Sequence, residues 1–415
     1  MTAAENTNLL VVGAGPAGLA AARAVAAAGH HVIVIDREDE AGGVPRHCAH
    51  TGFGLRDLHR TYSGPTYAKE IVRRTLADGV EIRTGTTATD WAGSTSMHTT
   101  SRIGRSLINA DAVLLATGCR ERPPSARLIP GSRPAGIYTT GALQQLVHLA
   151  GHPVGRRAVV VGAEHIAFSA VHTLLGSGTE VAAVITPSPI LQTFQLLRAG
   201  TAGIHAIPVL YGCDITAIEG SKRVTGLSIT SATGISTRLA CDTTVFTGDW
   251  IPDYELARSA NLAMDAATKG PITDTAGSTS RPGVYAAGNV CHPAEPADIA
   301  ALTGAHIGHS ITAWLDGSSS SAREWQQSTL LQVSSPLLWI SPQRLVPSRL
   351  PACDRFVLRA EKQAGAGTIT VTQQGHTLYR HRVRRLTPNR SLTLPADWTT
   401  AVDSGGTVVI GFQPR

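Results

Sequence analysis

Cysteine pairs and long apolar runs are both missing from this sequence of 415 residues. Its six cysteines, at positions 48, 119, 213, 241, 291 and 353, form no C-x-x-C pair, which argues against a zinc ribbon or an iron-sulfur cluster. The N-terminal apolar run Leu9–Val12 stops at Gly13 and no 18-residue apolar span follows, so the sequence predicts neither a secretory leader nor a transmembrane helix. We therefore expect a cytoplasmic protein with reduced thiols, no metal site and no membrane partner.

Blocks of like charge are scarce as well. The 36 Lys and Arg residues exceed the 30 Asp and Glu residues, but no consecutive basic run stands out, so nucleic acid is not an expected partner. Glycine and hydrophobic residues are abundant instead, with 42 glycines and 42% hydrophobic residues, as tight turns and a sizeable buried core require. A chain of this length predicts two or three packed units.

A strand, a glycine-rich turn, a helix and a second strand follow one another near the N-terminus. Residues 8–12 are apolar, residues 19–28 form an Ala-rich helical stretch, and His31–Ile35 is a second apolar run. This order is typical of a βαβ unit in a parallel sheet that is covered on both faces. The same order returns at 157–161, 165–176 and 180–185, so we predict an α/β protein with two Rossmann-like, three-layer nucleotide-binding domains.

The C-terminal part has a different character. Pro, Gly and Asn separate short alternating segments there, namely Arg355–Arg359, Thr368–Thr372, Thr377–Val383 and Thr407–Phe412. They predict a small β-rich, sandwich-like domain behind a Ser-rich linker at 317–321. The expected division is residues 1–123 and 256–320 for the first nucleotide-binding domain, 124–255 for the second, and 330–415 for the β domain.

The first turn carries a G-x-G-x-x-G motif directly after a strand and directly before a helix. Gly13 permits the tight turn, Gly15 lets the backbone approach a pyrophosphate, and Gly18 lets the helix sit close to the strand. The helix N-terminus then offers N–H groups to the two phosphates. The residues of this turn that we predict to bind a cofactor are Gly13, Gly15, Pro16, Ala17 and Gly18.

Asp36 ends the second strand, 18 residues after Gly18. A carboxylate at this place can accept hydrogen bonds from an adenosine ribose and repels a 2′-phosphate, which favours FAD or NAD over NADP. We include the next residue, Arg37, in the predicted cofactor site.

Three distant segments, Glu40–Gly43, Leu114–Gly118 and Pro282–Asn289, distinguish between these dinucleotides. Together with the first turn they resemble the two-dinucleotide-binding flavoproteins of the pyridine nucleotide-disulfide oxidoreductase superfamily, over roughly residues 8–315. The resemblance implies that the four segments wrap FAD, with further contacts from Gly42, Gly43, Arg46, Ala116, Thr117, Gly118, Gly288 and Asn289. The superfamily usually has Asp where this chain has the uncharged Asn289.

The second nucleotide fold departs from the motif. Glu164 stands where a second glycine would admit a phosphate, and the strand ending at Thr186 offers neither an acid for a ribose nor an Arg pair for a 2′-phosphate. These features argue against NAD(P) binding by the second fold. The alternatives are that this fold is vestigial or merely structural, or that it contains an altered nucleotide site. The superfamily's redox disulfide is also absent, because neither Cys48 nor Cys119 has a partner at a suitable spacing.

A narrower resemblance rests on the segments 42–47, 50–54, 63–68, 116–123 and 246–252. They are similar to the FAD-containing subunits of hydrogen cyanide synthase, opine oxidase, hydroxyproline dehydrogenase and heterotetrameric sarcosine oxidase. This resemblance implies an oligomer that oxidises amino-acid or amine C–N bonds alongside a second flavoprotein or an iron-sulfur subunit. The chain lacks that branch's Cys-rich C-terminal segment, so an unfamiliar partner or a self-contained activity is left open.

Arg46 and His47 follow the Gly42–Gly43 loop and are the predicted catalytic residues. Flavin chemistry uses a hydrogen-bond donor or base near N5 and a positive charge near N1. His50, Cys48 and His292 are the secondary candidates. We expect an FAD-dependent dehydrogenase or oxidase, or its electron-transferring subunit, that oxidises a small amino-acid or amine substrate by hydride transfer to flavin N5. The alternatives are an NAD(P)H-dependent flavoprotein reductase and a non-catalytic electron-transfer or structural subunit.

Overall fold

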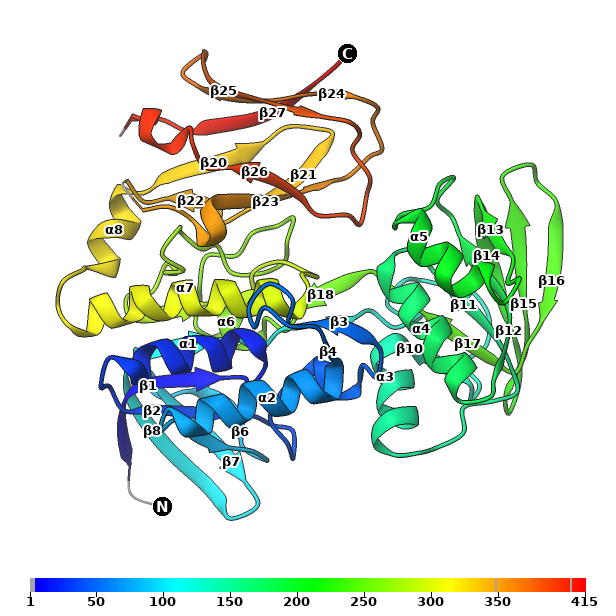
Figure 1. The fold of residues 1–415 in the computed structure, drawn as a ribbon, viewed down its shortest axis with the longest axis horizontal. Coiled ribbons are helices and arrows are strands. Elements are labelled where there is room, and N and C mark those ends of the chain that lie inside the picture. The colour runs from blue at the N-terminus through cyan, green and yellow to red at the C-terminus, as the bar shows by residue number, and fades with distance from the viewer. Residues whose placement is uncertain (1–3, 348, 404) are drawn as a thin grey trace. The chain divides into compact units, whose positions relative to one another are not determined.

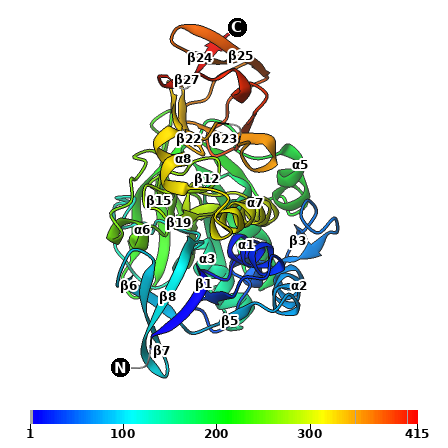
Figure 2. The ribbon, with the colours of Figure 1, turned by 90° about the vertical axis from the view of Figure 1, so that its left-hand side faces the viewer.

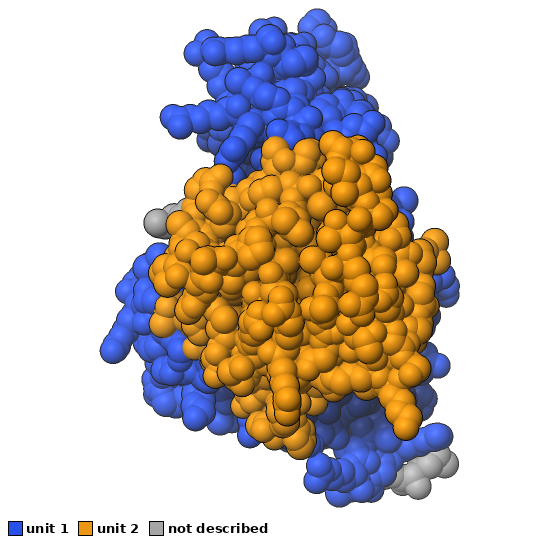
Figure 3. All heavy atoms as spheres, turned by 90° about the vertical axis from the view of Figure 1, so that its right-hand side faces the viewer, with its two compact units in different colours: residues 1–46, 52–119, 251–415 blue, residues 47–51, 120–250 orange. Residues whose placement is uncertain are grey.

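A computed structural model of the chain describes residues 4–347, 349–403 and 405–415. These residues form two compact units, which Figure 3 colours separately. Unit 1 contains the N-terminal segment through Arg46, Gly52–Cys119 and Ile251–Arg415, and unit 2 contains His47–Thr51 and Arg120–Trp250. The division into four sequence ranges stays a prediction, because a compact unit is not by itself a domain that folds alone.

A seven-stranded sheet forms the centre of unit 1 (Figure 1), in the order β5-β2-β1-β8-β7-β6, with β19 also paired to β8. Strands β5, β2, β1, β8 and β19 are parallel, whereas β7 and β6 are antiparallel to their neighbours. The bounds are β1 Glu5–Val12, β2 Val32–Ile35, β5 Glu81–Arg83, β6 Thr87–Trp91, β7 Ser96–Ser101, β8 Gly104–Leu115 and β19 Val284–Ala286.

The apolar side chains of this sheet are buried on both faces. Along β1, Leu9 and Val11 belong to one hydrophobic cluster, and Leu10 and Val12 belong to the other. A parallel strand between two layers needs this two-sided burial, which explains why the strand appears in the sequence as a continuous apolar run.

The helices of unit 1 are α1 Pro16–Ala27, α2 Gly64–Ala77, α6 Glu255–Ser259, α7 Ala297–Leu315 and α8 Ser321–Gln327. Helices α1 and α7 lie side by side in both ribbon views (Figures 1 and 2). A Cβ on Gly304 of α7 would lie 2.0 Å from the carbonyl oxygen of Ala17, and one on Gly308 would lie 2.7 Å from that of Ala21. The two helices therefore pack backbone against backbone. Within the described ranges, no helix has both the length and the apolar character needed to cross a membrane.

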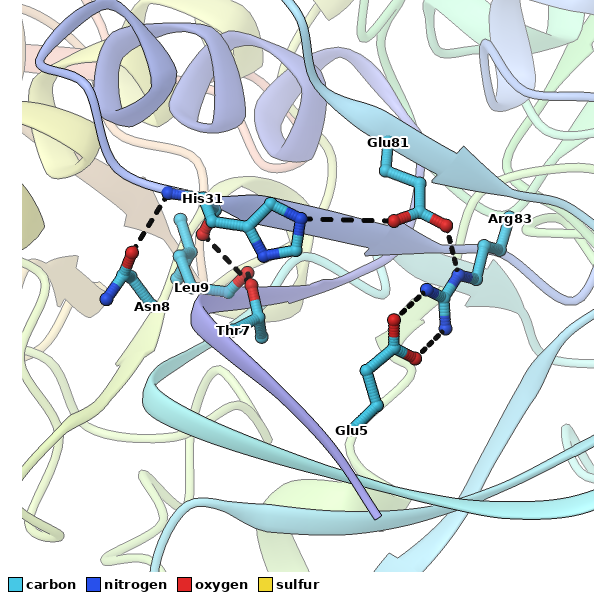
Figure 4. A network of polar contacts seen from close by, with 7 residues as sticks. All are labelled: Glu5, Thr7, Asn8, Leu9, His31, Glu81 and Arg83. Carbon is cyan, nitrogen blue, oxygen red and sulfur yellow. Dashed lines mark hydrogen bonds and ion pairs between the residues drawn. The ribbon is translucent and has the colours of Figure 1, made fainter. Parts of the chain in front are cut away.

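A polar network ties the start of β1 to the neighbouring strands (Figure 4). Arg83 of β5 donates hydrogen bonds to both carboxylate oxygens of Glu5 at 2.6 Å, and to Glu81 at 2.7 Å. The N–H of His31 donates to the side-chain oxygen of Asn8 at 2.9 Å. Hydrogen bonding from Arg83 lowers the pKa of Glu5. This network holds the amino end of β1, whereas the predicted cofactor site lies at its carboxyl end.

Unit 2 contains a second parallel sheet, in the order β10-β17-β11-β12-β13. Its strands are β10 Ile137–Thr139, β11 Arg157–Val161, β12 Glu180–Thr186, β13 Val209–Tyr211 and β17 Thr243–Phe246. The helices are α3 Thr140–Gln144, α4 His165–Gly176 and α5 Gln195–Arg198, and an antiparallel sheet contains β14 Cys213–Gly220, β15 Val224–Ser231 and β16 Ser236–Ala240. The predicted pair of Rossmann-like folds is thus confirmed.

Four short strands remain. The chain enters unit 2 within β9 (Cys119–Glu121) and leaves it within β18 (Trp250–Pro252). Strands β3 (Thr51–Phe53) and β4 (Tyr62–Ser63) form a two-stranded sheet.

The C-terminal region of unit 1 contains two sheets, ordered β22-β20-β27-β24-β25 and β21-β23-β26, whose strands are labelled in Figure 1. Their strands are β20 Thr329–Val333, β21 Leu337–Ser341, β22 Arg344–Leu345, β23 Arg355–Ala360, β24 Gly367–Gln373, β25 His376–Val383, β26 Leu392–Pro395 and β27 Val408–Pro414. Both sheets contribute to one hydrophobic cluster, which includes Phe356, Ile369 and Ile410. All four predicted strand segments overlap observed strands, and the assignment as a separate sandwich-like domain stays a prediction.

Candidate functional site

The glycine-rich turn lies between β1 and α1. Gly13 adopts a φ of +114°, a value that favours glycine, and a Cβ on it would lie 2.4 Å from the carbonyl oxygen of Ala116. A Cβ on Gly18 would lie 2.0 Å from the carbonyl oxygen of Gly13. The fold itself therefore requires both of these glycines.

Gly15 differs from its two neighbours in the motif. Its φ of −83° suits any residue, and among the described residues a Cβ there would meet only the Cα of Gly43, at 4.0 Å. Gly15 precedes α1, whose first turn has no acidic residue and receives no hydrogen bond from a capping side chain. The first N–H groups of α1 thus border a space that the chain leaves open, which fits a dinucleotide pyrophosphate.

Asp36 follows β2 and lies beside the same turn. Its Oδ2 accepts a hydrogen bond from the N–H of Ala14 at 2.7 Å, and its Oδ1 accepts one from the N–H of Glu38 at 2.9 Å. Each oxygen keeps a further lone pair, so this fixed carboxylate can still accept a hydrogen bond from a ribose hydroxyl. Arg37, also in the predicted site, forms an ion pair with Asp253 at 3.2 Å. The ribose contact stays a prediction.

The second predicted loop packs against the first turn. The N–H of Gly42 donates to the carbonyl oxygen of Ala14 at 2.8 Å, and Gly43 is the residue that faces Gly15. Arg46 follows in the short 3-10 helix Val44–His47. Its guanidinium lies 3.3 Å from the carboxylate of Glu40 and 3.8 Å from that of Glu38. The buried Nε of Arg46 has no hydrogen-bond partner among the described residues.

Two further predicted segments reach the same turn. After β8, Ala116 contacts Gly13, while the Thr117 hydroxyl donates to the carbonyl oxygen of Asp253 at 2.7 Å. The carbonyl oxygen of Gly118 accepts a hydrogen bond from the N–H of Asp253 at 2.9 Å. After β19, Gly288 packs so closely on α1 that a Cβ there would lie 2.8 Å from the Cβ of Ala17. Segments that are far apart in the sequence therefore meet around the N-terminus of α1.

Asn289 uses both ends of its side-chain amide within the chain. Its Oδ1 accepts a hydrogen bond from the N–H of Glu295 at 2.8 Å, and its Nδ2 donates to the carbonyl oxygen of Glu295 at 3.2 Å. An ionised Asp cannot donate the second of these bonds, so the departure from the usual Asp closes the loop between the two residues. The sequence did not reveal this role, and the predicted cofactor contact of Asn289 stays a prediction.

The two predicted catalytic residues belong to different compact units, Arg46 to unit 1 and His47 to unit 2. His47 and Cys48 are both buried. Burial, reinforced by the charge of Glu121, raises the pKa of the Cys48 thiol to about 12. A thiol with this pKa is protonated at neutral pH, so Cys48 is a poor candidate for nucleophilic or redox chemistry. His50 places its Nδ1 2.9 Å from the carbonyl oxygen of Thr51.

His292 is also buried, and its ring centroid lies 5.0 Å from that of Trp339. Burial, together with the charge of Arg359, lowers the pKa of His292 to about 3. The ring is therefore neutral at physiological pH and supplies no positive charge to a flavin.

Two features of the region were not predicted. Asp298, buried at the start of α7, forms an ion pair with Arg56 at 2.9 Å. Helix α7 itself presents Gly304 and Gly308 to α1. Two glycines four positions apart in a helical stretch were the available signal, because this spacing places small residues on one helix face.

Comparison with known proteins agrees with this geometry. The model of the family described as "Pyridine nucleotide-disulphide oxidoreductase" matches residues 7–311. An opine oxidase subunit from Rhizobium meliloti is 28% identical over 316 residues, which cover 69% of this chain and 59% of that protein. The sarcosine oxidase alpha chain from Corynebacterium sp. (strain P-1) is 28% identical over 290 residues, which cover 65% of this chain and 29% of that protein.

Among solved structures, thioredoxin reductase from T. acidophilum superposes with a TM-score of 0.63 at 21% identity, covering 76% of this chain and all of that one. This likeness shows the fold. The matches to the two oxidase subunits span about three-fifths of the first and less than a third of the second.

Proposed function

The chain belongs to the pyridine nucleotide-disulphide oxidoreductase family, a family of FAD-dependent oxidoreductases, and from that premise we propose that it is a dehydrogenase or oxidase of amino-acid or amine C–N bonds. It performs this reaction alone or as the electron-transferring subunit of a larger enzyme. The observation that carries the proposal is the open space at Gly15, because a pyrophosphate needs this space and the fold does not.

FAD fits the residues around the start of α1. The turn Gly13–Gly18 would hold the pyrophosphate, and Asp36 would accept hydrogen bonds from the adenosine ribose. When bound, FAD supplies an acceptor for a hydride from a substrate carbon. The guanidinium of Arg46, held by Glu38 and Glu40, can stabilise negative charge on a ligand, and its Nε still has a donor to offer.

The proposed substrate class is supported by the relatives. The opine oxidase and sarcosine oxidase relatives are both named for substrates that contain an amine C–N bond. Both are also named as subunits, which supports an oligomer that includes a second flavoprotein or an iron-sulfur subunit. No nucleic acid and no membrane enter this proposal.

The C-terminal region, which contains two sheets, is the proposed docking surface for such a partner. Residues 331–415 contain 11 Lys and Arg but only 4 Asp and Glu. Their net charge of +7 (11 less 4) exceeds the net charge of +6 of the whole chain. Four exposed arginines gather on or next to the edge strand β25, namely Arg380, Arg382, Arg384 and Arg385. His381 and Val383 interrupt this cluster, which is why it does not stand out as a basic run in the sequence. An acidic partner surface would be complementary.

A cytoplasmic location is also proposed. The six cysteines are all free, which supports it.

Anaerobic titration of freshly purified protein tests the function. We expect a yellow protein whose flavin absorbance bleaches when a secondary-amine amino acid is added, and not when NADH or NADPH is added. A colourless protein that takes up no FAD would remove the cofactor from the proposal. Bleaching by a nicotinamide but by no amine would favour the reductase instead.

A further inference from the structure

The two nucleotide folds have the same backbone where the first helix begins. Gly162 follows β11 with a φ of +132°, as Gly13 follows β1 with a φ of +114°. The N–H of Gly162 donates to the carbonyl oxygen of Ile185 at 2.8 Å, and that of Gly13 donates to Ile35 at the same distance. The second turn is therefore built to the same plan as the first.

The residue that precedes the helix is a glycine in the first turn and a glutamate in the second. Gly15 has φ −83° and ψ −179°, and Glu164 has φ −89° and ψ −179°. A side chain has therefore been added at position 164 to a backbone that is otherwise unchanged. No strain opposes a glycine there, since these angles are extended backbone that any residue adopts.

The carboxyl group of Glu164 folds back over the turn. A Cβ on Gly162 would lie 2.7 Å from its Oε2, and a Cβ on Gly248 would lie 3.2 Å from its Oε1. Glu164 is 7% exposed, and its Oε1 has no hydrogen-bond partner among the described residues. A Rossmann-type fold holds the pyrophosphate of a dinucleotide in this place, against the glycine turn and the helix N-terminus.

The surroundings act on the Glu164 carboxyl group in two directions. Burial raises the pKa of Glu164, but the hydroxyl of Thr247, the N–H groups of Glu164 and Ala163, and the charge of Arg127 all act in the opposite direction. Arg127 is itself fixed by donating to the carbonyl oxygens of Thr247 at 2.7 Å and Gly248 at 2.8 Å. Donors that would otherwise serve a phosphate thus act on a carboxyl group of the chain.

We propose that Glu164 is a built-in substitute for the pyrophosphate, and that it determines the specificity of the chain by excluding NAD(P) and other ADP-containing nucleotides from unit 2. A single change, Glu164→Gly, then reopens the site. The inference rests on the geometry of unit 2 alone and holds whatever substrate the first site serves.

Calorimetric titration of ADP into protein that is loaded with FAD and freed of unbound FAD tests this inference. We expect no measurable binding of ADP to the wild type. For Glu164→Gly we expect an affinity at least about tenfold above the weakest affinity that the titration detects. Bound FAD fills the first nucleotide site and no free FAD competes with ADP for unit 2, so the heat of ADP binding reports on unit 2. Flavin content is measured separately, so a failure of the proposed FAD site appears as lost colour and not as a lost difference between the variants.

Two variants serve as controls. Glu164→Gln keeps the volume of the side chain and should still exclude ADP, whereas Glu180→Gly removes an exposed carboxylate of the same unit and should behave as the wild type. Equal ADP affinity in wild type and Glu164→Gly would overturn the inference, whether both bind or neither binds. ADP affinities are compared among variants whose circular dichroism spectrum and thermal midpoint match those of the wild type.

Discussion

Arg359 donates a hydrogen bond to the carbonyl oxygen of Pro293 at 3.0 Å, and so connects a C-terminal strand to the loop that follows Gly288. The same guanidinium lies 3.7 Å from the carboxylate of Glu295, and these side chains are only 11% and 9% exposed. Asn289 holds the backbone of Glu295 in turn. The C-terminal region is thus linked to the predicted FAD segment through a short chain of polar contacts.

Replacing Arg359 with Met should destabilise the protein by about 3–5 kcal/mol, because it leaves the buried Glu295 carboxylate without its cationic partner. Denaturant unfolding measures the loss. The double variant Arg359→Met/Glu295→Gln should recover part of it, since no buried charge is then unpaired. If the double variant is no more stable than Arg359→Met, the ion pair does not account for the effect.

Gly15→Leu should abolish FAD binding while leaving the fold intact. The Leu side chain enters the space that the pyrophosphate needs, and its Cβ would meet only the Cα of Gly43 among the described residues, at 4.0 Å. We expect a drop of at least about 100-fold in FAD affinity, with stability changed by less than about 1 kcal/mol. Reconstitution with FAD, followed by absorbance, measures it.

Gly176→Leu is the matched control, because a Cβ on Gly176 meets nothing within 4 Å among the described residues and no nucleotide is expected there. Equal flavin content in the two variants would contradict the placement of the pyrophosphate at Gly15.

The stability of the chain should depend on pH through Glu121. Burial, with a contribution from the charge of Glu164, raises the pKa of Glu121 from 4.5 to about 7 in the folded chain, against opposing hydrogen bonds from Gly141 and Thr140 and the charge of Arg127. The folded state therefore binds more protons than the unfolded state between these two pH values. The stabilisation is fully present below pH 4.5 and is lost as the pH rises towards 7.

Glu121→Gln removes this titration while keeping an acceptor for the N–H of Gly141, which lies 2.8 Å from Oε2 of Glu121. Relative to this variant, the wild type should lose about 3 kcal/mol of unfolding free energy between pH 4.5 and 7. Parallel pH profiles of the two proteins would show that Glu121 titrates normally in the folded state.

Thiol labelling should separate Cys353 from Cys48. Cys353 is exposed, whereas Cys48 is buried with a pKa of about 12. With iodoacetamide at pH 8, peptide mapping should find Cys353 modified quickly and Cys48 unmodified until the chain unfolds. Cys353→Ser should remove the rapid label. Modification of Cys48 at the rate of Cys353 would restore it as a candidate for chemistry.

The glycine turn was predictable because its chemistry is local. Gly13 and Gly18 are required by contacts within a single βαβ unit, and such a unit can be recognised from consecutive residues. The place of Glu164 in the second turn followed from the same spacing. The spacing did not show that the carboxyl folds back over Gly162, because that depends on side-chain rotation.

The remaining parts of the site depend on contacts between distant residues. Both ends of the Asn289 amide bond the backbone of Glu295, a contact that the sequence did not reveal, while its cofactor contact stays a prediction. His292 was a secondary candidate for catalysis; burial and the charge of Arg359 lower its pKa, and its ring lies against that of Trp339, both from the C-terminal strands. No local pattern contains this information, because tertiary packing creates these environments.

The near-identical backbones at Gly15 and Glu164 have an evolutionary consequence. The backbone before the helix is nearly the same in the two turns, and the side chain of Glu164 occupies the place that Gly15 leaves open, so a lineage can close a nucleotide cradle by substitution without rebuilding a loop. In such a duplicated architecture the number of nucleotides bound is not fixed by the fold, and closely related chains can differ in it.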